Sequence, residues 1–173
     1  ADISAVDAPT FILTPFHTIK PSTEILDAMQ EALDTHSRLN RVHIVVTGPS
    51  GVGKSAIAEK FTTSNAEFWK EKDGDQVLIK PVIYVRLPRG ASPAVTASRV
   101  ARAIGLARYD RKTERVLTHE ILDAIDLHEI KMIIIDEAQH IRVSTSKPND
   151  DVRHLLKDLD NEGRVNIAFF GME

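Results

Sequence analysis

The chain has 173 residues, of which 42% are hydrophobic and 27% are charged, and its formal net charge is −3 at pH 7. This balance is typical of a folded globular protein, and the length allows one domain with a substantial core. No apolar run approaches the roughly 20 residues of a membrane-spanning helix, and no secretory leader is apparent at the N-terminus. The sequence contains no cysteine, which excludes disulfides and thiolate zinc sites. We therefore expect a cytoplasmic protein without membrane contact.

The N-terminal third of the chain combines an irregular start with a helix and a strand. Residues 1–20 lack periodicity and contain prolines, so we expect an N-terminal arm. Residues 23–39 carry apolar side chains at helical spacing and predict an amphipathic helix. Residues 42–47 form a β-branched run typical of a buried strand. This run leads into a glycine-rich segment and a predicted helix over residues 54–62.

The remaining two thirds alternate strands with helices. Residues 64–76 are polar and predict a loop with a turn at Gly74. The elements predicted after it are a strand over 82–87, helices over 93–104 and 114–127 with a basic loop over 107–113 between them, a strand over 131–135, a polar loop over 144–150, a helix over 151–162 and a strand over 165–170. Such alternation predicts an α/β fold in three layers, with helices on both faces of a mainly parallel sheet.

Residues 48–55 read Gly-Pro-Ser-Gly-Val-Gly-Lys-Ser and lie between a predicted strand and a predicted helix. Glycines permit the backbone conformations that turn successive N–H groups towards a phosphate, and the helix N-terminus adds further donors. Lys54 is placed to reach the β- and γ-phosphate oxygens, and Ser55 offers a hydroxyl to Mg²⁺. The predicted nucleotide-binding residues are Gly48, Pro49, Ser50, Gly51, Val52, Gly53, Lys54, Ser55 and Ala56. We therefore predict a P-loop nucleoside-triphosphatase with ATP and Mg²⁺ as cofactors.

A second motif follows about 80 residues later and supplies two carboxylates. Residues 132–137 read Met-Ile-Ile-Ile-Asp-Glu, which predicts a buried strand that ends in acids. Asp136 is the predicted partner of Ser55 in holding Mg²⁺. Glu137 is the predicted base that orients and deprotonates the attacking water, so Glu137 and Lys54 are the predicted catalytic residues. Gln139 is a candidate sensor of the γ-phosphate.

Two other enzyme classes share parts of these motifs. The acids are followed by Ala138, Gln139 and His140, which resembles a helicase box, but a helicase needs a second RecA-like domain that 173 residues cannot hold. A small-molecule or protein kinase can use the same phosphate loop. Kinases of this kind usually lack the second acid, so Glu137 argues against that interpretation.

A basic stripe runs through residues 86–115 of this slightly acidic chain. Its members are Arg86, Arg89, Arg99, Arg102, Arg108, Arg111, Lys112 and Arg115. One interpretation is ordinary solvated surface charge, the usual fate of such runs. The other is contact with DNA phosphates that reads no base sequence, for which the candidates are Arg89, Arg108, Arg111 and Lys112. An arginine of the stripe could also act on the nucleotide of a neighbouring subunit.

From about Phe16 to its end the chain resembles the TniB/TnsC group of AAA+ ATPases, which regulate DNA transposition. The resemblance lies in the phosphate loop at 48–55, the strand at 82–87 with the helix that ends at 104–105, the string Ile-Ile-Ile-Asp-Glu-Ala-Gln-His at 133–140, the helix at 153–162 and the strand at 165–171. The Asp-Glu-Ala-Gln-His string is more specific than the two nucleotide motifs, although it is also found in MuB-like and ExeA-like ATPases.

The resemblance implies a protein that assembles on duplex DNA as a ring or filament when ATP is bound. It further implies that the assembly recruits transposase subunits and that hydrolysis disassembles it. The implied nucleotide residues are Gly51, Gly53, Lys54, Ser55, Asp136 and Glu137, and the implied DNA contacts lie at 89–92 and 108–115. The alternative is an AAA+ ATPase of secretion or replication whose hydrolysis is controlled by a protein partner.

The resemblance also carries departures at the C-terminal end. Relatives usually follow the glycine of the fourth strand with a polar sensor, whereas Gly171 is followed by Met172 and Glu173. The small helical lid of AAA+ proteins and its sensor arginine are not among these 173 residues. We therefore expect residues 21–173 to be the large AAA+ subdomain, incomplete at its C-terminus.

Overall fold

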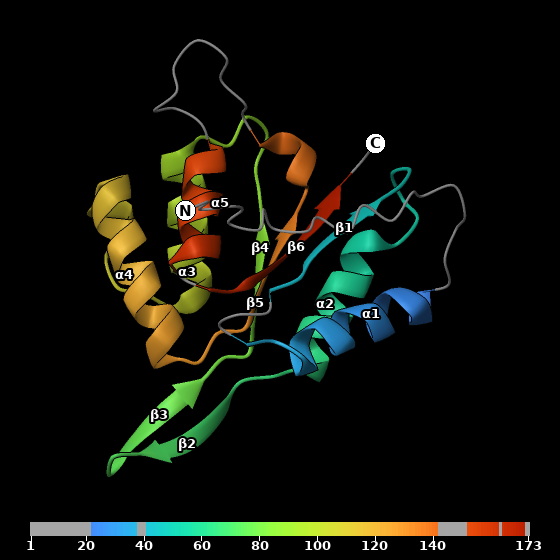
Figure 1. Cartoon of the computed structure of the whole chain (residues 1–173). Coiled ribbons are helices and arrows are strands. Elements are labelled where there is room, and N and C mark those ends of the chain that lie inside the picture. The colour runs from blue at the N-terminus through green and yellow to red at the C-terminus, as the bar shows by residue number, and fades with distance from the viewer. Residues whose placement is uncertain (1–21, 38–40, 142–151, 163, 172–173) are drawn as a thin grey trace, which may run out of the picture.

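The computed structural model describes residues 22–37, 41–141, 152–162 and 164–171, and these residues form one α/β unit (Figure 1). The predicted arm over 1–20 and the predicted loop over 144–150 lie outside the described residues. None of the helices in the described ranges has the length and apolar character that a bilayer crossing requires.

A four-stranded parallel sheet forms the centre of the molecule. Its strands follow the order β1 (His43–Thr47), β6 (Asn166–Gly171), β5 (Met132–Asp136) and β4 (Val82–Arg86). Each neighbouring pair is parallel, with Thr47 opposite Gly171 and Asp136 opposite both Phe170 and Arg86. The predicted parallel sheet is thereby confirmed, and all four strands end at the same edge.

Helices cover both faces of this sheet (Figure 1). One face carries α1 (Ser22–Asp34) and α2 (Lys54–Ser64), and the other carries α3 (Pro93–Ile104), α4 (Glu114–Leu127) and α5 (Val152–Asn161). Alternate residues of β5 serve the two cores, since Ile133 and Ile135 pack with the second group of helices while Met132 and Ile134 pack with the first. All five residues of β5 are buried, as its continuous apolar run predicts.

The turn predicted at Gly74 is confirmed, but the loop predicted around it over 64–76 is wrong, because most of this segment is a β-hairpin. Helix α2 extends to Ser64, and β2 (Phe68–Lys72) then pairs antiparallel with β3 (Asp75–Ile79). The turn residues Asp73 and Gly74 both have positive φ angles, 53° and 89°. An Asp-Gly pair favours this kind of two-residue hairpin turn, and that signal outweighs the polar composition.

The predicted limits of the helices agree with the structure for α3 and α4 but not for the end of α1. Helix α3 begins after Ser92, whose Oγ accepts from the Val95 N–H at 3.3 Å. Helix α1 was predicted to reach residue 39 but ends at Asp34. The N–H and the hydroxyl of Thr35 both donate to the Glu31 carbonyl, and the His36 ring then contacts the Arg164 carbonyl at 2.8 Å. Of the predicted last turn, residues 35–37 are not helical, and residues 38 and 39 lie outside the described residues.

Candidate nucleotide site

The glycine-rich segment links the end of β1 to the start of α2. Gly51 and Gly53 have φ angles of 83° and 88°, a left-handed conformation that side chains with a Cβ rarely adopt. Gly53 is the residue before the helix and supplies no side-chain cap. The first N–H groups of α2 therefore lack intrahelical partners, which makes the loop and helix start a surface of donors suited to a phosphate.

Lys54 folds back over this loop. Its Nζ donates to the carbonyl oxygens of Gly48 at 2.7 Å and Pro49 at 2.6 Å. An ammonium group has three protons, so one donor remains for a ligand after these two bonds. The lysine thus holds the loop closed on itself and keeps a positive charge at its centre.

Asp136 ends β5 beside this loop and is almost fully buried, with 2% exposure. Its Oδ1 accepts from the N–H of Glu137 at 2.9 Å, and its Oδ2 accepts from the hydroxyl of Tyr84 at 2.7 Å. Burial raises the pKa of Tyr84 above its usual range, and the hydrogen bond to Asp136 raises it further. The phenol therefore stays protonated and donates to the carboxylate.

Glu137 turns its side chain across the end of the sheet. Its φ of 59° lies in the left-handed region, an unusual conformation for a residue other than glycine. The Gln139 amide donates to Oε2, and the Arg86 guanidinium lies 3.4 Å from Oε1. Gln139 and Arg86 thus each contact one carboxylate oxygen of the predicted base.

Gly171, the last residue of β6, allows Gln139 to approach the sheet. A Cβ at this position would lie 2.8 Å from the Gln139 side-chain oxygen and 3.4 Å from its backbone nitrogen. The short 3-10 helix η2 (Ala138–His140) packs against β6 at this point. Gly171 lies on β6, the strand between β1 and β5. Its lack of a side chain therefore lets Gln139, the predicted γ-phosphate sensor, take this position.

These groups meet in a cavity of about 270 Å³ at the edge where the strands end. Its lining comprises Ser50, Gly51, Gly53, Lys54, Ser55, Ala56, Asp136, Glu137 and Gly171. The two sequence motifs are therefore brought together, although Gly48, Pro49 and Val52 belong to the loop without lining the cavity.

The donor set of this cavity fits Mg²⁺, which prefers oxygen ligands. Ser55 contributes a hydroxyl and Asp136 a carboxylate. Both hydrogen-bond donors to Asp136, Tyr84 and the Glu137 N–H, are neutral, and within the described residues no salt bridge involves Asp136. A buried carboxylate without a cationic partner is costly, so a cation held here would offset that cost.

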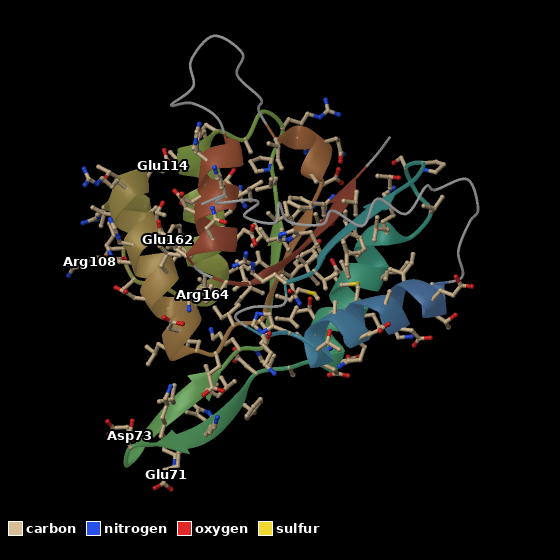
Figure 2. The ribbon with its side chains drawn as sticks, in the orientation of Figure 1. Glu71, Asp73, Arg108, Glu114, Glu162 and Arg164 are labelled. Atoms are coloured by element: carbon tan, nitrogen blue, oxygen red, sulfur yellow. The ribbon has the colours of Figure 1, made fainter. Side chains whose placement is uncertain are left out.

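The basic candidates lie in two loops at the two ends of α3. Arg89 precedes the helix at the edge that carries the cavity, and Arg108 and Arg111 follow it (Figure 2 labels Arg108). The 12 residues of α3 separate these loops by about 18 Å along the helix axis. Arg89, Arg108 and Arg111 are exposed, whereas Lys112 is half-buried and donates to the Glu120 carboxylate at 2.6 Å. Lys112 is therefore the weakest of the four predicted DNA contacts.

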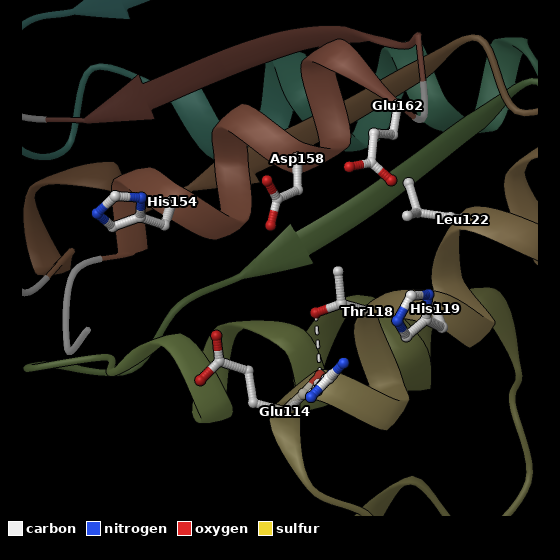
Figure 3. A pocket seen from close by; sticks show the side chains of 8 residues that line it. Glu114, Thr118, His119, Leu122, His154, Asp158 and Glu162 are labelled. Atoms are coloured by element: carbon white, nitrogen blue, oxygen red, sulfur yellow. Dashed lines mark hydrogen bonds between the residues drawn. The ribbon is translucent and has the colours of Figure 1, made fainter. Parts of the chain in front are cut away.

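A larger cavity, of about 600 Å³, lies between α4 and α5 (Figure 3). Its carboxylates come from Glu114, Asp158 and Glu162, and the hydroxyl of Thr118 donates to the Glu114 carbonyl at 3.0 Å. Arg115, His119 and His154 also line this cavity, and the described residues contain no group of three or more His, Cys, Asp or Glu side chains that could hold a metal ion. The smaller cavity is the one that contains the glycine-rich loop and both acids of the second motif, so we take it as the candidate nucleotide site despite its smaller volume.

Besides Gly171, which lines the cavity, sequence reasoning missed two partners of the acids, Tyr84 for Asp136 and Arg86 for Glu137. Both lie on β4, two residues apart and therefore on the same face of that strand. They are also the polar side chains of an otherwise aliphatic strand, and this is the sequence feature that could have identified them.

A parallel sheet with a glycine-rich loop after β1 and two acids after β5 defines a P-loop NTPase fold. The sequence matches the family model described as Bacterial TniB protein over residues 7–173, so the chain belongs to the TniB family. The chain is thus an AAA+ type protein associated with transposition. A search of curated proteins returned no match.

Proposed function

We propose that this protein binds and hydrolyses ATP with Mg²⁺ and thereby controls its own assembly on duplex DNA. In the ATP-bound state it self-associates on DNA as a ring or filament and recruits transposase subunits to the target site. Hydrolysis then releases the assembly. The observation that carries this proposal is the cavity in which Lys54, Ser55, Asp136 and Glu137 lie together.

The roles of the side chains follow from their positions. The loop N–H groups and the remaining Lys54 proton bind phosphate oxygens. Ser55 and Asp136 would hold Mg²⁺, which supplies positive charge against the phosphates. Glu137 accepts a proton from the attacking water as its oxygen bonds to the γ-phosphorus and the bond to the bridging oxygen of ADP breaks. Gln139, hydrogen-bonded to Glu137, is placed to report whether the γ-phosphate is present.

DNA contact is assigned to the two basic loops at the ends of α3. Exposed guanidinium groups about 18 Å apart along the helix can reach phosphates at separate points of a duplex. Such contacts carry no base information, so the protein should accept DNA of any sequence.

The test is fluorescence anisotropy of a labelled random-sequence duplex with the protein in ATP, in ADP and in a non-hydrolysable ATP analogue. We expect tight association only with ATP or the analogue, and an affinity that falls steeply between about 50 and 200 mM salt. Arg111→Ala should weaken DNA association and reduce the salt slope by about one unit. The matched control is Lys112→Ala, which should change less because Lys112 is already paired with Glu120.

Equal DNA association in ATP and ADP would refute an ATP-controlled assembly. Nucleotide binding and hydrolysis with no DNA association at low salt would instead favour the alternative, an AAA+ ATPase whose hydrolysis is controlled by a protein partner.

A further inference from the structure

Tyr84 is the side chain that connects the core of the protein to the buried carboxylate of the nucleotide site. In the sheet register Tyr84 lies opposite Ile134, and Asp136 is two residues further along β5 on the same face. Aromatic side chains reach such diagonal neighbours, and the hydroxyl of Tyr84 is 2.7 Å from Asp136 Oδ2. The contact is therefore a product of strand register rather than of the phosphate loop.

The ring of Tyr84 is partly buried. It packs against the core cluster between the sheet and the pair α1 and α2, whose members include Ala58 and Phe61 of α2. Helix α2 also begins with Lys54 and Ser55. Tyr84 therefore fixes the Asp136 carboxylate relative to the same helix that carries the other predicted Mg²⁺ ligand.

The two anchors of Asp136 differ in what they control. The Glu137 N–H reaches Oδ1 from within the same turn, so it moves with Asp136. Tyr84 reaches Oδ2 from the neighbouring strand. A carboxylate with only the first anchor can rotate about its Cβ–Cγ bond, whereas both anchors together fix the plane of the group.

Resting on the proposed function, we propose that Tyr84 is a positioning residue that orients Asp136 for Mg²⁺ and so sets the magnesium requirement of the site. Tyr84 does not line the cavity itself. Hydrogen bonds to a metal-holding carboxylate commonly change metal affinity by about tenfold or more when they are removed.

The test is Tyr84→Phe, which removes the hydroxyl and keeps the ring. Binding of a fluorescent ATP analogue is measured in EDTA and then in rising MgCl₂, and thermal unfolding is measured without nucleotide. We expect unchanged affinity in EDTA, and a Mg²⁺ midpoint for the added affinity that rises about tenfold. Hydrolysis should show the same shift in midpoint, with a rate at saturating Mg²⁺ close to that of the parent.

Tyr109→Phe is the matched control because it makes the same chemical change at the other tyrosine, in η1 (Tyr109–Arg111). We expect its Mg²⁺ midpoint to equal that of the parent. A Tyr84→Phe midpoint equal to that of the parent would overturn the role of Tyr84 while leaving the proposed function intact. A parent protein whose ATP affinity gains nothing from Mg²⁺ would overturn both.

A double-variant cycle separates this role from general loosening of the core. Asp136→Asn is compared with Tyr84→Phe/Asp136→Asn, and any shift that Tyr84 exerts through the carboxylate should disappear in the Asn background. If the hydroxyl shifts the Mg²⁺ midpoint equally in both backgrounds, Tyr84 does not act through Asp136. Should Tyr84→Phe lower thermal stability, the cycle still decides, because the same substitution is made in the Asp136 background and in the Asn background.

Discussion

The four-stranded sheet and the β2–β3 hairpin are both built from strands of five or six residues, yet their strands differ in burial and in the packing around them (Figure 1). Strand β5 is buried throughout and has a neighbour on each side. Strand β2 is exposed along its whole length, and Phe68 and Trp69 are 49% and 67% exposed. The hairpin is fastened to the body through buried Ile79 and through Lys70, which pairs with Glu129 at 2.9 Å.

This contrast shows where the fold specifies side-chain positions. At the carboxyl end of the sheet, register and burial leave Asp136 little freedom, and Glu137 follows it with its carboxylate bonded to Gln139 and Arg86. On the outer side of the hairpin, including the acidic tip with Glu71 and Asp73 (Figure 2), side chains face solvent. We expect substitutions at the edge to change nucleotide chemistry sharply and substitutions on the outer hairpin to leave it unchanged.

The largest effect is expected for Glu137→Gln, which keeps the shape of the side chain and removes the base. ATP hydrolysis should fall by about 100-fold or more, since general-base catalysis contributes on that scale. ATP binding should persist, so any ATP-dependent DNA assembly should accumulate rather than disappear. Phosphate release and nucleotide affinity are measured side by side. Equal hydrolysis by the variant and the parent would remove Glu137 from the role of base.

Lys54→Ala is expected to have the next largest effect, on binding rather than on chemistry. It removes the charge at the centre of the loop and two bonds that hold the loop, to Gly48 and Pro49. Hydrogen bonds to charged groups contribute about 1.5–3 kcal/mol, so ATP affinity should fall by about 10- to 100-fold. Calorimetric titration with ATP measures this, with Lys60→Ala on the same helix as the control. Equal losses for both lysines would contradict a local role of Lys54.

The contrast also explains how much was predictable from the sequence. The phosphate loop and the acids of β5 follow from residue types at fixed spacing, and both the parallel sheet and the limits of α3 and α4 agree with the structure. The turn at Gly74 agrees with the structure, but its two flanking strands were missed because β2 is exposed along its length and the segment is polar. Beyond the early end of α1, His36 contacts the Arg164 carbonyl, 128 residues away in the chain, a contact that no local pattern contains.

The partners of the two acids were beyond the sequence for a related reason. Tyr84 and Arg86 are visible as polar residues in a strand, but their targets depend on which strand lies beside β4 and in which register. A one-residue shift in register would turn Tyr84 away from Asp136. Local motifs therefore predict the groups that contact a ligand, and only the assembled sheet reveals the groups that position them.

A smaller effect on hydrolysis is expected for Gly171→Ala, because Gly171 is beside Gln139 and acts on the predicted base Glu137 only through that side chain. The added Cβ would lie 2.8 Å from the Gln139 side-chain oxygen, so that side chain must move and its bond to Glu137 should break. Since the displaced group is the end of a flexible side chain, stability should change little. Hydrolysis should fall by about threefold to tenfold, on the scale of one hydrogen bond. Gln139→Ala should match this loss, and a Gly171→Ala protein with full activity would exclude Gln139 from the reaction.

The smallest effect is expected for Trp69→Ser, on the outer side of the hairpin. This change loses a cross-strand pair with Leu78, so the free energy of unfolding should fall by less than about 1 kcal/mol. Nucleotide affinity and hydrolysis should equal those of the parent. The matched control is Ile79→Ala in the partner strand, where a side chain of 2% exposure is truncated and about 2–4 kcal/mol should be lost. Urea unfolding measures both. A Trp69→Ser protein that folds normally but hydrolyses ATP more slowly would erase the distinction between the two regions, because it would tie the exposed hairpin to the chemistry of the sheet edge.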